Sequence, residues 1–168
     1  HAVKVEFPEH TVMAVPYDMF ISGYNSKAVN PLVLWSAKSP SSASIDLSYF
    51  VRGEHLKALE QNTMAEVISK VLYPADDHIE GKRLRLKQQY LLVSASLQSI
   101  LKNHIKNYGN LDTLPDKVAI HINETHPALC VPELMRILMD EYSYGWDEAW
   151  DITCRTLSYT NHTVMSEA

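Results

Sequence analysis

The chain of 168 residues is 46% hydrophobic and 21% charged, proportions that are ordinary for one globular domain with a sizeable core. Its net charge of −5, without a run of basic residues, argues against a nucleic-acid partner. No apolar stretch approaches the roughly 20 residues that cross a bilayer, so no membrane partner is expected either.

Two strands are predicted near the start of the chain. Residues 12–15 and 29–37 are apolar runs bounded by turn residues, with Pro16 ending the first run and a turn signal at residues 23–26 between the two. The two runs are expected to pair as a hairpin with a long connection. A short capped turn is expected at residues 46–50.

Two helical patterns follow, over residues 54–72 and 82–106, with a loop at residues 73–81 between them. The first pattern slips near Asn62, which indicates two short helices with Asn62 capping the second. The second pattern carries two apolar ridges, which predicts a long helix buried on a broad face. The ridge residues are Leu86, Tyr90, Val93, Leu97 and Ile100, with Leu84, Leu91 and Ala95 beside them.

Strands and helices alternate again in the last third of the chain. An apolar run at residues 118–122 predicts a buried strand, and Thr125 is a candidate N-cap for a helix that runs to about residue 141. Another helix follows Gly145, and a polar loop at residues 158–163 comes after it. The side chains expected on one side of this helix are Trp146, Ala149, Trp150, Thr153 and Leu157. The alternation predicts an α/β fold.

Three polar loops stand out, at residues 73–81, 123–127 and 160–163, each at the end of an apolar element. They combine carboxylates, amides and histidines with a tyrosine, a mixture that suits sugar hydroxyls and the apolar face of a pyranose ring. Loops that only cap helix ends have a similar composition, and composition alone favours this second interpretation. The loop that follows the strand at residues 118–122 is the more informative one, because open α/β sheets hold ligands at the carboxyl ends of their strands.

Other chemistries lack their motifs. His121, Glu124 and His126 do not have the spacing of a helical zinc motif, and on a strand the two histidines would face opposite sides, so no metal site is expected. A nucleophile elbow and a phosphate-binding glycine loop are both missing from the sequence. Cys130 and Cys154 lie in apolar helical patterns and are interpreted as buried thiols of a reducing compartment, so a cytoplasmic location is expected.

Several motifs resemble segments of the α-glucan phosphorylases (glycogen, starch and maltodextrin phosphorylase), in the order of that family. They are Ala14-Val-Pro-Tyr-Asp18, Leu34-Trp-Ser-Ala-Lys38, Val71-Leu-Tyr-Pro74, Glu80-Gly-Lys82, Leu84-Arg-Leu-Lys-Gln-Gln-Tyr90, Asn123-Glu-Thr-His-Pro-Ala-Leu129 and Tyr159-Thr-Asn-His-Thr163. The resemblance covers nearly the whole chain from about Thr11. It implies that residues 1–168 are an interior fragment of a single α/β domain, the partial Rossmann-like N-terminal domain of a glycosyltransferase-B type fold.

The resemblance implies no catalytic residue in this fragment, and it implies substrate-binding roles for Tyr73, Asp76, Asp77, Arg85, Glu124, His126 and His162. The loop at residues 73–77 matches a gate beside the catalytic cleft, and Arg85 matches an arginine near the cleft entrance. Glu124 and His126 match residues that border the sugar subsites, and His162 matches a histidine whose main chain meets the transferred sugar. The sequence departs from the family at Glu124, where Asp is usual, at Asp77, where Asn is usual, and at His121, where Gln is usual.

The reaction implied is reversible phosphorolysis of a terminal α-1,4-linked glucosyl unit, which yields glucose 1-phosphate. The implied partners are an α-1,4-glucan, phosphate and a second copy of the parent enzyme. Pyridoxal phosphate is implied as the cofactor of the parent, but no segment here matches its attachment lysine, so the fragment is expected to hold no cofactor and to be inactive alone. Its expected contribution is to position the glucan.

The chain starts without Met and ends just after a motif, so it is expected to be an excerpt of a longer protein. An excerpt exposes apolar surface intended for absent neighbours, which predicts self-association. Two alternatives stay open on the residues alone. One is a freestanding α/β ligand-binding or interaction module without catalysis, and the other is a metal-dependent hydrolase.

Overall fold

The computed structural model describes residues 1–40 and 55–164, with the side chains of α2 described only from residue 63 onward. The chain divides into two compact units, residues 1–91 and 92–168. Helices and strands occur in both, which confirms the mixed α/β class, although the sheets are small. The turn predicted at residues 46–50 lies outside the described residues.

The first unit contains an antiparallel sheet of order β1-β2-β3, formed by Val3–Glu6, Thr11–Ser22 and Val29–Lys38. The predicted hairpin of β2 and β3 is confirmed, but the prediction that Pro16 ends the first strand is wrong, because Pro16 pairs with Trp35 and the strand continues. β1 pairs with residues 11–14 only, so Pro16 lies where one edge of β2 is open. A proline on an open edge removes no ladder hydrogen bond.

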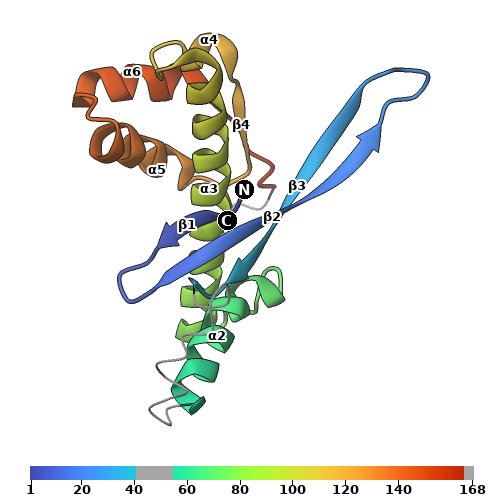
Figure 1. The fold of residues 1–168 in the computed structure, drawn as a ribbon, viewed down its shortest axis with the longest axis vertical. Helices are drawn as coiled ribbons and strands as arrows, with labels where there is room; N and C mark the ends of the chain where they lie inside the picture. The colour runs from blue at the N-terminus through green and yellow to red at the C-terminus, as the bar shows by residue number, and fades with distance from the viewer. Residues whose placement is uncertain (41–54, 165–168) are drawn as a thin grey trace. The chain divides into compact units, whose positions relative to one another are not determined.

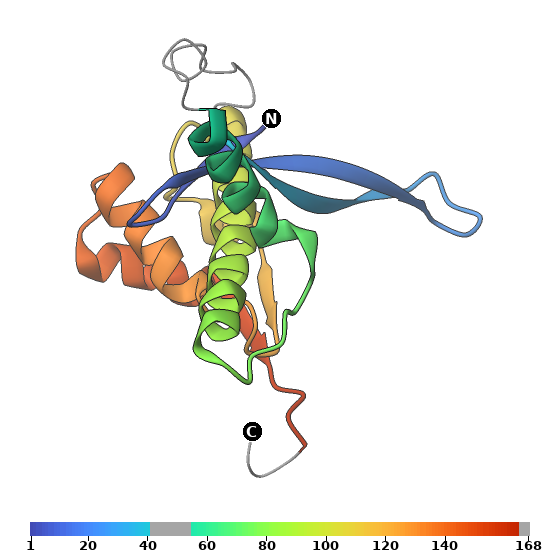
Figure 2. The same cartoon turned by 90° about the horizontal axis from the view of Figure 1, so that it is seen from below.

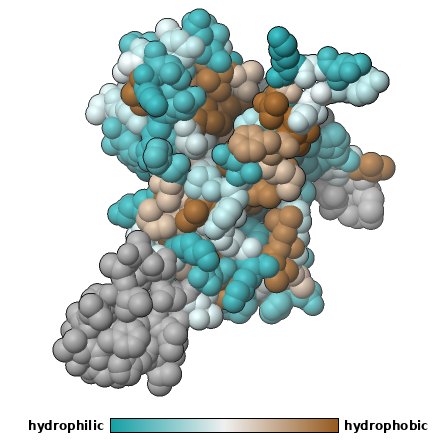
Figure 3. Space-filling model, turned by 45° about the vertical axis from the view of Figure 1, so that its right-hand side comes forward, coloured by the Kyte–Doolittle hydropathy of each residue, from teal (hydrophilic) through white to brown (hydrophobic). Residues whose placement is uncertain are grey.

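The outer part of the hairpin is apolar and exposed on both faces. Figures 1 and 2 show the hairpin continuing well past the end of β1, and Figure 3 shows apolar side chains reaching the surface on one side of the molecule. The large exposed side chains are Tyr17, Met19, Phe20, Ile21, Leu32, Val33 and Leu34. Strands that are apolar on both faces are typical of a sheet covered on both sides. We therefore still predict that this chain self-associates, and we expect the exposed apolar hairpin to be the surface through which it does so.

The two predicted long helices are present as α2, His55–Lys70, and α3, Ile79–Tyr108. The interpretation of the first as two short helices is wrong, since α2 is continuous. Ser69 ties α2 to the sheet by accepting a hydrogen bond from the Ala37 N–H at 2.8 Å. Leu86 was expected on a buried ridge of α3 but is 56% exposed. The apolar ridge continues along the helix past the elements that cover it, and periodicity alone does not locate that point.

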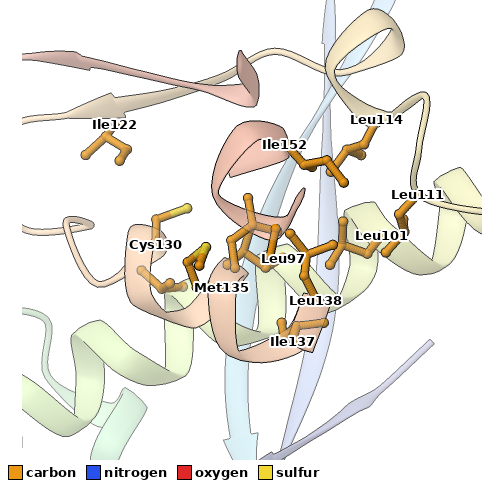
Figure 4. Packing of buried hydrophobic residues seen from close by; sticks show 13 residues of the cluster. Leu97, Leu101, Leu111, Leu114, Ile122, Cys130, Met135, Ile137, Leu138 and Ile152 are labelled. Carbon is orange, nitrogen blue, oxygen red and sulfur yellow. The ribbon is translucent and has the colours of Figure 1, made fainter. Parts of the chain in front are cut away.

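The second unit surrounds a core built on the later turns of α3. Its other elements are α4 (Leu114–Lys117), β4 (Ile120–Asn123), α5 (Cys130–Arg136), the π-helix η2 (Ile137–Glu141), α6 (Trp146–Thr156) and β5 (Leu157–Thr160). Figure 4 shows side chains from these elements converging on the core. The fully buried leucines at its centre are Leu97, Leu101, Leu111, Leu114, Leu134 and Leu138. No helix in the described part of the chain is long and apolar enough to span a bilayer.

Several local predictions for this unit are wrong. Residues 158–160 are not loop but belong to β5, which pairs in parallel with β4. Thr125 is not the N-cap of α5, whose cap is Leu129, because the intervening residues form successive turns in which the Ala128 N–H donates to the Thr125 carbonyl. Cys154 is exposed, whereas Cys130 is buried and has its pKa raised to about 11 by that burial.

The buried side of α6 is not the side that carries its tryptophans. Its buried residues are Ala149, Ile152, Thr153 and Thr156. Trp146 and Trp150, which were expected to share a side with Ala149 and Thr153, are 63% and 48% exposed. The two stripes share Ala149 and Thr153 and both have helical spacing, so the pattern alone does not choose between them.

Candidate functional site

The loop between α2 and α3 is held in place by a buried glutamine. The Gln88 amide nitrogen donates to the Ile68 carbonyl at 2.9 Å and to the Val71 carbonyl at 2.8 Å, which satisfies the end of α2. Its amide oxygen accepts the Tyr73 N–H at 3.0 Å. Tyr73 has a left-handed backbone, with φ of 52°, so this contact stabilises an otherwise unfavourable conformation.

Sequence reasoning missed Gln88, although a signal for it exists. It lies four residues after Leu84 and three before Leu91, so it falls on a buried ridge of α3, where it is 4% exposed. A polar side chain at such a position needs hydrogen-bond partners inside the protein. The amide of Gln88 finds all three of its partners in the loop and the helix end that precede α3.

Three of the residues assigned to substrate binding lie together beside this loop. The Arg85 guanidinium donates to the Asp76 carboxylate at 3.2 Å and lies 5.3 Å from the centre of the Tyr73 ring. Asp77 contacts a different group, the Nδ1 of His78, at 2.9 Å. Because these contacts are exposed, each stabilises the loop only weakly, so they favour one conformation of the loop without making it rigid.

The loop between α2 and α3 passes close to Gly81, and the absence of a side chain there leaves room for it. A Cβ at this position would lie 1.8 Å from the Ala75 carbonyl oxygen, which is a backbone atom and cannot rotate away. We therefore expect Gly81→Ala to displace the loop and to lower the free energy of unfolding by about 1–3 kcal/mol, as other overpacked sites do. Urea denaturation and limited proteolysis between α2 and α3 would measure both effects.

Gly145→Ala serves as the control for this substitution, since a Cβ there meets nothing within 4 Å. Its helix-cap and chain-entropy effects oppose one another, so a change below about 1 kcal/mol is expected. Equal stability and equal proteolysis of wild type and Gly81→Ala would contradict the prediction.

In the second unit, parallel pairing brings two of the predicted polar loops together. Asn123 at the end of β4 pairs with Thr160 at the end of β5, and the Glu124 N–H donates to the Thr160 carbonyl at 2.8 Å. Residues 123–126 and 160–163 therefore leave the same edge of the two-stranded sheet. This edge is formed by the carboxyl ends of parallel strands, where α/β proteins hold ligands.

The Glu124 carboxylate is the centre of this arrangement. One oxygen, Oε2, accepts the His162 main-chain N–H at 2.5 Å. The other, Oε1, accepts the Thr125 N–H at 3.1 Å and the Thr163 hydroxyl at 3.2 Å. These bonds, chiefly the one from the His162 backbone, lower the pKa of Glu124, so the group is a carboxylate at neutral pH.

The imidazoles of His162 and His121 have separate partners. The His162 Nε2 lies 2.5 Å from the Asn123 amide oxygen, and since that oxygen only accepts, the imidazole N–H is the donor. His121 Nε2 lies 2.6 Å from the Thr160 hydroxyl. His126 is half-buried in the turn that leads to α5. Among the residues that the structure describes, no group of three His, Cys, Asp or Glu is placed to hold a metal ion.

The comparisons with known proteins extend over almost the entire chain. A family model described as carbohydrate phosphorylase matches residues 1–168. Glycogen phosphorylase of Haemophilus influenzae is 50% identical, and the muscle form of human glycogen phosphorylase is 48% identical, each over 94% of this chain. The chloroplastic/amyloplastic α-1,4 glucan phosphorylase L-2 isozyme of Solanum tuberosum is 52% identical over 94% of the chain. The chain spans 16–19% of the length of these relatives.

Proposed function

The chain belongs to the carbohydrate phosphorylase family, and on that premise we propose that it is a segment of an α-glucan phosphorylase. The parent would transfer the terminal glucosyl unit of an α-1,4-glucan to phosphate and release glucose 1-phosphate. Residues 1–168 would form part of the N-terminal domain of a glycosyltransferase-B type fold. The parent would be a cytoplasmic homodimer.

The role proposed for this segment is to supply walls and a gate for the glucan site. The observation that carries it is the juxtaposition of residues 123–126 and 160–163 at the carboxyl ends of β4 and β5. Carboxylate, amide, imidazole and hydroxyl groups gather there, and each of them can bond to sugar hydroxyls. In the first unit, the Tyr73 ring with Arg85 and Asp76 offers the aromatic and charged pair expected of a gate.

Members of the family use pyridoxal phosphate. A lysine that forms a Schiff base works as a desolvated amine. In residues 1–40 and 63–164, where side chains are described, no lysine is buried, so these residues do not fit that group. The proposed contribution of this chain to the reaction is binding and orientation, which lowers the entropic barrier without moving a proton.

The experiment that tests this proposal compares two polypeptides. The full-length protein that contains this segment, supplied with an α-1,4-glucan and phosphate, is expected to release glucose 1-phosphate. Residues 1–168 alone are expected to release none. A coding sequence that stops at Ala168 would favour a freestanding binding module, and an inactive full-length protein would contradict the proposed reaction.

Arg85 offers a test of the proposed gate. In the full-length enzyme, Arg85→Met removes the contacts to Asp76 and Tyr73, each worth about 0.5–1 kcal/mol at an exposed site, so KM for the glucan should rise about two- to fivefold. Arg83→Met is the matched control, because Arg83 lies on the same helix and its ion pair, with Glu80, is also exposed. Steady-state kinetics at saturating phosphate would measure both. An equal effect of the two substitutions would argue against a gate role for Arg85.

A further inference from the structure

Both oxygens of the Glu124 carboxylate are occupied by groups of the protein itself. The main-chain N–H of His162 occupies Oε2, and the N–H of Thr125 together with the hydroxyl of Thr163 occupies Oε1. These three donors take most of the roughly four acceptor sites of a carboxylate, and two of them come from a segment 38 or 39 residues away. Glu124 therefore directs most of its hydrogen-bonding capacity to the segment after β5.

The backbone of Glu124 also contributes to holding the two loops together. Its φ of 71° lies in the left-handed region, which costs a residue other than glycine about 1–2 kcal/mol. Such a conformation persists where surrounding contacts over-determine it, and these sites are concentrated at functional positions. Here the Glu124 N–H bonds the Thr160 carbonyl while its side chain bonds His162 and Thr163, so one residue ties the two loops together through both its backbone and its side chain.

The consequence of these bonds is a fixed direction for the His162 carbonyl. The Glu124 carboxylate holds the peptide unit before His162 through its N–H, and the Asn161 side-chain oxygen holds the unit after it by accepting the Thr163 N–H at 2.6 Å. Because a peptide unit is planar and trans, the His162 carbonyl points opposite to that Thr163 N–H. The His162 imidazole, bonded to Asn123, constrains the same residue a third time.

We propose that Glu124 is a positioning residue, which holds the main chain of residues 161–163, and with it the His162 carbonyl, in one orientation toward the glucosyl unit. This inference rests on the proposed function for the identity of the ligand. The resemblance already implies that the main chain at His162 meets the sugar, and the new element is that Glu124 acts on the sugar through that main chain.

Two substitutions separate a positioning role from direct contact. The Glu124→Gln side chain has one accepting oxygen in place of two, so it can serve either His162 or the pair Thr125 and Thr163, and the arrangement must open on one side. Glu124→Asp keeps both oxygens and suits a left-handed backbone better than Glu does, because Asp adopts that region more readily. Glu148→Gln is the matched control, since Glu148 is an exposed carboxylate in the first turn of α6 with no part in the site.

The experiment uses the full-length protein and two readouts. Hydrogen exchange followed by mass spectrometry should show the amides of residues 161–163 exchanging about ten- to a hundredfold faster in Glu124→Gln, which is the loss expected for one hydrogen bond to a charged group. kcat/KM for the glucan should fall by a similar factor. Glu124→Asp should retain both the protection and the activity of wild type, and Glu148→Gln should leave both unchanged.

The two readouts allow the positioning role and the proposed function to be tested separately. If the full-length wild type releases no glucose 1-phosphate, the proposed function fails, while the exchange rates still report on the position of residues 161–163. If Glu124→Gln loses activity with unchanged exchange, or if Glu124→Asp loses activity with intact protection, Glu124 acts on the ligand directly and the positioning role is overturned.

Discussion

Replacing Arg136 with methionine is expected to lower the free energy of unfolding by about 3 kcal/mol, because it leaves a buried carboxylate without its cation. Glu133 is 3% exposed, and Arg136 holds both of its oxygens, with Nε at 2.8 Å and Nη2 at 2.9 Å. Ser94 donates a further hydrogen bond to Glu133 at 2.7 Å. The Arg136 side chain is 38% exposed, so solvent offsets part of the loss and the low end of the range for buried pairs applies.

A double substitution shows whether the cost comes from the unpaired charge. Glu133→Leu combined with Arg136→Met removes both partners, and this double variant is expected to be clearly more stable than Arg136→Met alone. Urea denaturation of the three proteins, with a shared slope, measures the difference. A double variant no more stable than the single one would show that Arg136 acts through its packing and not through the charge of Glu133.

Leu134→Ala is expected to destabilise the protein by about 2–5 kcal/mol, the range for large-to-small changes in a closed core. Leu134 lies in α5, is fully buried, and belongs to the cluster that packs α3, α5 and α6 together in the second unit. Since α5 follows directly on the turn after β4, this packing also holds the polar edge at residues 123–126 in place. The loss of stability therefore bears on the candidate site as well as on the core.

Leu86→Ala is the matched control for this prediction. Leu86 is 56% exposed on α3, so removing its side chain leaves no cavity and should change the stability by less than about 0.5 kcal/mol. Thermal unfolding of both variants provides the comparison. A similar decrease in the unfolding temperature for Leu134→Ala and Leu86→Ala would mean that Leu134 is not enclosed in a tight core.

The local elements could be predicted because their causes are local. The long helix α3 and the hairpin of β2 and β3 follow from apolar periodicity and turn residues that lie within a few positions of one another. The strand β5 has no such signal. Its four residues, Leu157–Thr160, are mostly polar, and they form a strand only because β4, more than 30 residues earlier, provides a partner. Strand propensity depends on that partner.

By itself, the sequence determined the family, the mixed α/β class and the position of the polar loops, because motifs, periodicity and turn residues are properties of contiguous residues. Only the tertiary structure decided which groups in those loops meet. Gln88 holds Tyr73 across 15 residues, and Glu124 holds His162 across 38. Hydrogen-bond partners so distant in the chain are chosen by how the helices and strands pack, so contacts of this kind become visible only once the chain is folded.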